Sequence, residues 1–266
     1  MESLYRLHLG RSMLRHLALS LALAVAAGLA PGTLATVAAQ EGGDLQAQIL
    51  FAAQTEDLNL LAELVQSLSG RVKSGDADPA LQYHLAHAEY RYAELGAQRR
   101  PQAAEAALGD CVEQLERILQ RDAKSVEALT LESMCDDALA AHAKIRAVLL
   151  RSRAADRLDA AYKLGPRNPR VLLRMAETGL ERARPNSPDY RRALALLAQA
   201  VEIFEQTSAT AIDAPGWGHA EAYLAYGRQF LMQGDLVAAR NWTERALLAA
   251  PDYEAARRQL AQIQTQ

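Results

Sequence analysis

The stretch that decides the fold lies near the C-terminus, where residues 223–251 read YLAYGRQFLMQGDLVAARNWTERALLAAP. Two helical segments flank Gly234. Gly227 lies 12 residues before Ala239, Ala239 lies seven before Ala246, and Pro251 follows five residues later. Small side chains at such positions let two antiparallel helices cross closely, and a proline stops the second helix. The stretch therefore predicts a tightly crossed helical hairpin.

This pattern resembles the tetratricopeptide repeat (TPR), a helical hairpin of about 34 residues. The stretch departs from the TPR pattern at Thr243, where the family prefers a large aromatic residue, although Trp242 is adjacent. Weaker copies of the same spacing occur upstream, with small or apolar residues at Ala154, Ala161 and Pro166, at Ala193 and Ala200, and at Cys111, Ile118 and Ala123. The resemblance covers roughly residues 78–266. It implies an all-α fold, a right-handed α-solenoid of antiparallel helix hairpins ending in a polar capping helix at 252–264. Residues 168–171 and 214–218 further resemble a group of exported bacterial TPR proteins.

Composition agrees with a helical fold. The 266 residues include 54 Ala and 42 Leu but only 14 aromatic residues, which disfavours a β-sandwich or barrel. Periodicity predicts a helix whose apolar face runs from Leu58 to Leu68 and which ends near Gly75. Periodicity, glycines and prolines predict further helices at 78–95, 101–121, 125–141, 144–164, 168–184, 188–207, 217–233, 235–249 and 252–264. The break near 141–143 rests on helix length alone, because no Gly or Pro occurs between Asp110 and Gly165.

The first 39 residues have the organisation of a signal peptide. Three arginines precede an apolar run from Leu17 to Ala30, and Val37-Ala38-Ala39 offers a cleavage site before Gln40. The run is too short for a membrane span, so we expect export, to the periplasm if the source is Gram-negative. An uncleaved anchor is the alternative, and Met13 rather than Met1 could be the true start. We expect three parts: signal peptide 1–39, helical segment 40–77 and the repeat domain 78–266.

Charge and motifs exclude several functions. The net charge is −3, and it becomes −5 without residues 1–39, so neither nucleic acid nor an anionic membrane surface is an expected partner. The chain contains no phosphate-binding loop, nucleophile elbow or HExxH motif, and we predict neither an enzyme nor a cofactor. His84 and His87 could share a helix face as metal ligands, but two ligands do not make a site, and packing beside Tyr83 and Tyr90 is the simpler interpretation.

The two cysteines are expected to form a disulfide. Cys111 lies 12 residues before Ala123 and Cys135 lies 12 after it, so in the repeat register both stand at equal heights on facing helices. Facing Cα atoms of packed helices come roughly 4–6 Å apart, which suits a disulfide in an oxidising compartment. Two free, buried thiols are the alternative.

A stack of hairpins presents a concave surface formed by the first helix of each pair. The TPR resemblance implies groove residues at Arg170, Leu173, Glu177 and Leu180 in one repeat, and at Glu221, Leu224, Arg228 and Leu231 in the last; the alternative is that they merely cover the core. The leading hypothesis is a non-enzymatic interaction module or scaffold in the cell envelope that binds a protein or peptide. The alternative is a helper of solute uptake that encloses a small ligand, which a closed, apolar cavity would favour. Partner identity and oligomeric state do not follow from the sequence.

Overall fold

The computed structural model describes residues 31–75, 78–207 and 215–266, and in these ranges every regular element is an α-helix. The helices are α1 Pro31–Gln54, α2 Leu58–Lys73, α3 Pro79–Gly96, α4 Pro101–Arg121, α5 Val126–His142, α6 Ala147–Leu164, α7 Pro169–Arg182, α8 Pro188–Thr207, α9 His219–Met232, α10 Leu236–Ala249 and α11 Glu254–Gln264. The helices predicted from residue 78 onward all occur, with boundaries within three residues of the prediction.

The chain divides into two compact units, Met1–Glu41 and Gly42–Gln266. The apolar run of the expected signal peptide lies outside the described residues, and α1 begins at Pro31 and continues past residue 39. Cleavage before Gln40 therefore stays a prediction. Across the ranges that the structure describes, none of the helices combines the length and apolar character needed to cross a membrane.

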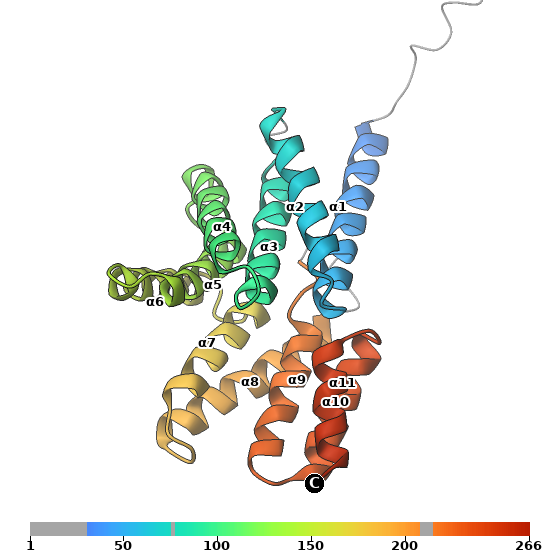
Figure 1. Cartoon of the computed structure of the whole chain (residues 1–266), viewed down its shortest axis with the longest axis vertical. Coiled ribbons are helices and arrows are strands. Elements are labelled where there is room, and N and C mark those ends of the chain that lie inside the picture. Colours follow the sequence, from blue (N-terminus) through green and yellow to red (C-terminus); the bar gives the residue numbers. More distant parts are fainter. Residues whose placement is uncertain (1–30, 76–77, 208–214) are drawn as a thin grey trace, which may run out of the picture. The chain divides into compact units, whose positions relative to one another are not determined.

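Within Gly42–Gln266 the helices pair in chain order (Figure 1). The closest pairs are α3 with α4, α5 with α6, α7 with α8 and α9 with α10, and each hairpin packs on the next. Helix α11 packs against α10, as expected for a capping helix. The predicted all-α solenoid of antiparallel hairpins is confirmed.

Local chemistry fixes where the helices begin. Asp57, Asp78, Ser125, Asn168 and Asp235 each accept a hydrogen bond from the first turn of the helix that follows. Helix α9 starts differently. Gly218 adopts a φ of 106°, which favours glycine, and its N–H donates to Glu221 Oε2 at 2.9 Å.

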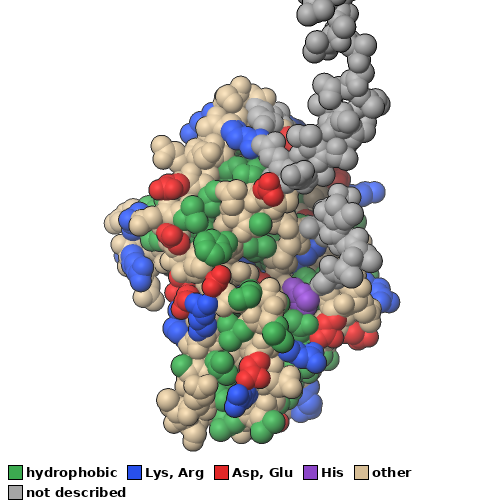
Figure 2. All heavy atoms as spheres, turned by 90° about the vertical axis from the view of Figure 1, so that its right-hand side faces the viewer, with side chains coloured by type: hydrophobic (Ala, Val, Ile, Leu, Met, Phe, Trp, Pro, Cys, Tyr) green, Lys and Arg blue, Asp and Glu red, His purple; other side chains and the backbone are tan. Residues whose placement is uncertain are grey.

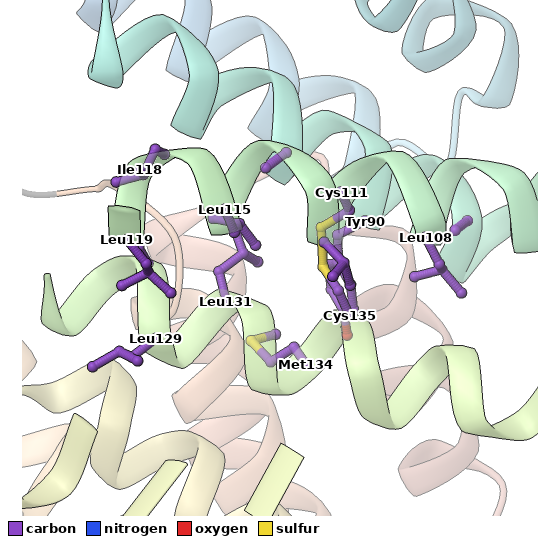
Figure 3. Close-up of a cluster of buried hydrophobic side chains, with 14 of the residues drawn as sticks. Tyr90, Leu108, Cys111, Leu115, Ile118, Leu119, Leu129, Leu131, Met134 and Cys135 are labelled. Atoms are coloured by element: carbon purple, nitrogen blue, oxygen red, sulfur yellow. A yellow bond between two sulfur atoms is a disulfide. The ribbon is translucent and has the colours of Figure 1, made fainter. Parts of the chain in front are cut away.

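The core of the first hairpins includes a covalent link. Cys111 of α4 and Cys135 of α5 are both fully buried and are joined by a disulfide, with Cα atoms 6.5 Å apart (Figure 3). The bonded sulfurs lie among leucines of the same two helices, including Leu108, Leu115 and Leu131.

Contacts between residues far apart in the sequence bring the first hairpins against the last ones. Arg258 of α11 forms a bidentate ion pair with Glu56, which precedes α2, across 202 residues. Trp217 Nε1 donates to Tyr83 Oη at 3.0 Å across 134 residues. These contacts place α3 beside the start of α9. The inner surface of the solenoid is therefore bordered by helices of the first and the last hairpins together, and not only by those of two neighbouring repeats.

Candidate functional site

A pocket of about 170 Å³ lies on this inner surface, where α3, α5, α7, α9 and the turn before α11 meet. It is lined by Tyr90, Arg91, Glu94, Met134, Leu173, Glu177, Trp217, Glu221, Leu224, Ala225, Arg228 and Tyr253. The helices involved are the first members of successive hairpins, as expected for a concave surface. Five of the eight groove residues predicted from the sequence are among the lining residues: Leu173, Glu177, Glu221, Leu224 and Arg228.

The other three predicted groove residues do not line this pocket. The Arg170 side chain is buried, and it donates from Nε to Glu127 at 2.9 Å and from Nη1 to the Pro215 carbonyl at 2.7 Å. Arg170 therefore holds the segment before α9 against α7 instead of facing a ligand. Leu180 is half-buried against the core of the last hairpins, and Leu231 is half-buried next to Met232, the last residue of α9.

One guanidinium organises the charged wall of the pocket. Arg91 donates from Nε to His87 Nε2 at 3.3 Å, from Nη1 to Glu94 at 2.9 Å and from Nη2 to Glu221. The Arg91 side chain is only 11% exposed, so these partners offset the cost of burying its charge. Each of the three nitrogens of Arg91 already has a partner within the protein.

Glu177 is the least satisfied carboxylate at the pocket. Its side chain is 34% exposed, and its nearest cation is Arg174 Nη1 at 4.0 Å. Arg174 in turn donates to Asp137 at 2.6 Å, which is the closer of the two contacts. Burial raises the pKa of Glu177 to about 7, against the opposing effect of Arg174.

Two tyrosines add neutral polar groups to the pocket walls. Burial raises the pKa values of Tyr90 and Tyr253 well above the usual range, so both stay protonated at physiological pH. Figure 2 shows one face of the molecule, on which acidic, basic and hydrophobic side chains lie next to one another.

The repeat pattern in the sequence does not reveal the contributions of α3 and of the turn before α11. Tyr90, Arg91 and Glu94 belong to a hairpin with a weak repeat pattern, and Tyr253 lies between the last hairpin and the capping helix. Their position depends on contacts such as Arg91 with Glu221, separated by 130 residues, which no local spacing reveals.

Burial and packing determine the surroundings of the two histidines singled out in the sequence. His87 is buried, accepts a hydrogen bond from Arg91 and packs against the Trp217 ring, with centroids 5.8 Å apart. Burial lowers the pKa of His87 well below its usual value and also lowers that of His84. Within the described ranges, no three His, Cys, Asp or Glu side chains are grouped so that they could hold a metal ion.

A solved structure of a thermophilic TPR protein from Thermus thermophilus is similar to this chain. The TM-score is 0.56 at 19% sequence identity, and the match covers 84% of this chain and 100% of the other. The fold is that of a TPR protein. No family model matches the sequence, and no curated protein is significantly similar to it. In this fold the pocket lies at the surface formed by the first helices of the repeats.

Proposed function

We propose that this TPR-fold protein is a non-enzymatic interaction module of the cell envelope, which holds a peptide segment of a partner protein in its inner pocket. The observation that carries the proposal is the convergence of five predicted groove residues, from two different repeats, on one pocket. A pocket walled by the first helices of several repeats suits an extended chain, because side chains from each repeat can contact successive residues of the ligand.

The polarity of the pocket favours a peptide over an apolar solute. Five of its lining residues are charged, namely Arg91, Glu94, Glu177, Glu221 and Arg228, and its volume is about 170 Å³. Enclosed sites for drug-sized ligands are larger, about 300–1,000 Å³, and are lined mainly by apolar side chains. The uptake-helper alternative therefore has less support from this site.

Export is part of the proposal. The disulfide between α4 and α5 is compatible with an oxidising compartment. We expect cleavage between Ala39 and Gln40, which the intact mass of the protein from envelope extracts would measure. A mature species that retains residues 13–39 would contradict export by a cleaved signal peptide.

Site-specific photo-crosslinking tests the inner pocket. A photoreactive amino acid at Arg228, an exposed pocket residue, should capture a partner in intact cells. The matched control carries the same group at Lys163, an exposed residue of α6 remote from the pocket lining. A partner captured equally well, or better, from Lys163 would place the interaction outside the pocket and would sink the proposal.

A further inference from the structure

The carboxylates of the inner pocket differ in how well they are satisfied. Glu221 uses one oxygen for Arg91 and the other for the N–H of Gly218. Glu94 accepts a hydrogen bond from Arg91 at 2.9 Å. Glu177 accepts no hydrogen bond from any described residue, and its only ion pair is the long contact with Arg174. Of the three pocket carboxylates, Glu177 alone has both oxygens open to a donor from a ligand.

None of the described guanidiniums near the pocket pairs closely with the Glu177 carboxylate. Arg91 has a partner at each nitrogen, and Arg174 makes its closer contact with Asp137. Arg228 is exposed and makes no ion pair with any of the described residues. Because a partly buried carboxylate loses hydration without gaining hydrogen bonds, a cationic donor from outside the protein would stabilise it.

The remaining walls fit the aliphatic part of such a donor. Tyr90, Met134, Leu173, Leu224 and Tyr253 supply apolar and aromatic surface around the carboxylate. Long cationic side chains pack their methylene groups against apolar surface and place the charged end beside a polar partner. A pocket volume of about 170 Å³ suits one such side chain. Tyrosine rings also attract a cation through their faces.

We propose that the inner pocket receives a lysine or arginine side chain of the partner protein, with the Glu177 carboxylate as its counter-ion. This inference rests on the proposed function and names the chemistry that the groove recognises. An anionic side chain is disfavoured because it would meet three carboxylates, those of Glu94, Glu177 and Glu221. Arg91 already uses three of its N–H donors within the protein, and the side chain of Arg228 is exposed to solvent.

Peptide titrations followed by NMR test this inference. Three short capped alanine peptides are compared, with a central lysine, a central norleucine of similar length without the charge, or a central glutamate. The lysine peptide should shift the side-chain carboxyl signal of Glu177 and the backbone amide signals of the pocket residues saturably, with a dissociation constant in the millimolar range or below; the amide signals also report binding to the variants. Glu177→Gln should weaken binding at least about fivefold, whereas Glu181→Gln, an exposed carboxylate one turn further along α7, should not change it.

Each outcome decides one of the two claims. Norleucine or glutamate peptides that bind as tightly as lysine, or a Glu177→Gln variant that binds unchanged, would overturn the cation inference. No saturable shift with the lysine peptide up to about 10 mM would overturn it too. Partner capture at Arg228 is independent of these titrations. Partner capture at Arg228 without selectivity for the lysine peptide would support the peptide-binding pocket and contradict only its preference for a cationic side chain. Capture at Lys163 that equals or exceeds capture at Arg228 would contradict both claims.

Discussion

The α5–α6 and α9–α10 hairpins share one architecture but are held together by different interactions. In α9–α10 small residues allow close approach, and a Cβ added at Gly227 would lie 3.1 Å from the carbonyl oxygen of Ala239. In α5–α6 the fully buried carboxylates of Glu132 and Asp136 face Arg157 and Arg153. The TPR spacing is strong only in α9–α10. It therefore identifies hairpins that pack through small residues, and it does not identify hairpins, such as α5–α6, that are held by buried ion pairs.

Even the α9–α10 hairpin has a polar component. Thr243 stands where a large aromatic residue is usual in TPR repeats, and its hydroxyl donates to the Ala239 carbonyl at 2.7 Å. Gln259 of α11 donates to the Thr243 hydroxyl at 2.8 Å. A side chain of the capping helix thus contacts Thr243 directly, while Trp242 packs on Tyr226 with centroids 4.9 Å apart.

The largest difference between the two regions should come from the disulfide, which links α5 to α4. Cys111→Ala/Cys135→Ala should lower the free energy of unfolding by about 3.5 kcal/mol in the chain-entropy account of a 24-residue separation. Either single Ala variant should cost about as much as the double variant, because the bond is lost in all three. Urea unfolding measures these costs. Alkylation of the unsubstituted protein, denatured without reductant, should add no mass because both thiols are in the disulfide. Single costs that are small and additive would show that the bridge is absent in solution.

The buried ion pairs should come next. Arg157→Met leaves the Glu132 carboxylate, which it contacts at 2.9 Å, without its counter-ion, and we expect a loss of about 3 kcal/mol at pH 8. Glu132→Leu combined with Arg157→Met should recover most of this loss, because an apolar pair leaves no unpaired buried charge. Equal stability of the single and double variants would mean that the pair does not hold α5 to α6.

In α9–α10 a change of size should matter more than a change of charge. Ala239→Leu adds volume to the crossing with Gly227 and should cost about 1–3 kcal/mol. Gln262→Leu, at an exposed position of α11, should have almost no effect. Thermal melts compare the two variants, and equal shifts would contradict the crossing at Ala239.

The last expected effect is a pH dependence of stability that arises in α5–α6 from Glu132. Burial raises the pKa of Glu132 to about 7, opposed by Arg157 and Arg153 and reinforced by Asp136 and Glu116. A folded-state pKa above the unfolded value of 4.5 means that the native state binds the extra proton, so stability falls as pH rises from about 4.5 to 7.

The slope from this one group is at most about 1.4 kcal/mol per pH unit. Glu132→Gln should flatten the dependence by that amount, measured as urea midpoints at several pH values. Glu244→Gln, on the exposed face of α10, is the control and should leave the slope as it is. An unchanged slope in Glu132→Gln would show that this carboxylate is ionised throughout the range.

Helices and their pairing could be predicted because local spacing and capping residues determine them. The same is true of the Gly227 and Ala239 crossing, and of the groove positions Glu177 and Arg228, which follow from one repeat register. The register could not show that Arg170 is used to hold residues 215–217, because that contact crosses to a segment without periodicity. Nor could it place Arg91 at the pocket or Glu132 in the core, since both depend on neighbours from other helices.

The ion pair between Glu56 and Arg258 has a consequence for how the protein unfolds. In an open solenoid each repeat touches only its neighbours, so stability is close to a sum of local terms and the ends can fray independently. Here Glu56, in the turn before α2, pairs with Arg258 of α11, and the Tyr83–Trp217 hydrogen bond adds a second long-range tie. The number of hairpins is thereby fixed, because adding or deleting one would separate these partners. Denaturation should accordingly occur as a single cooperative transition, without the gradual melting from the termini that characterises linear repeat arrays.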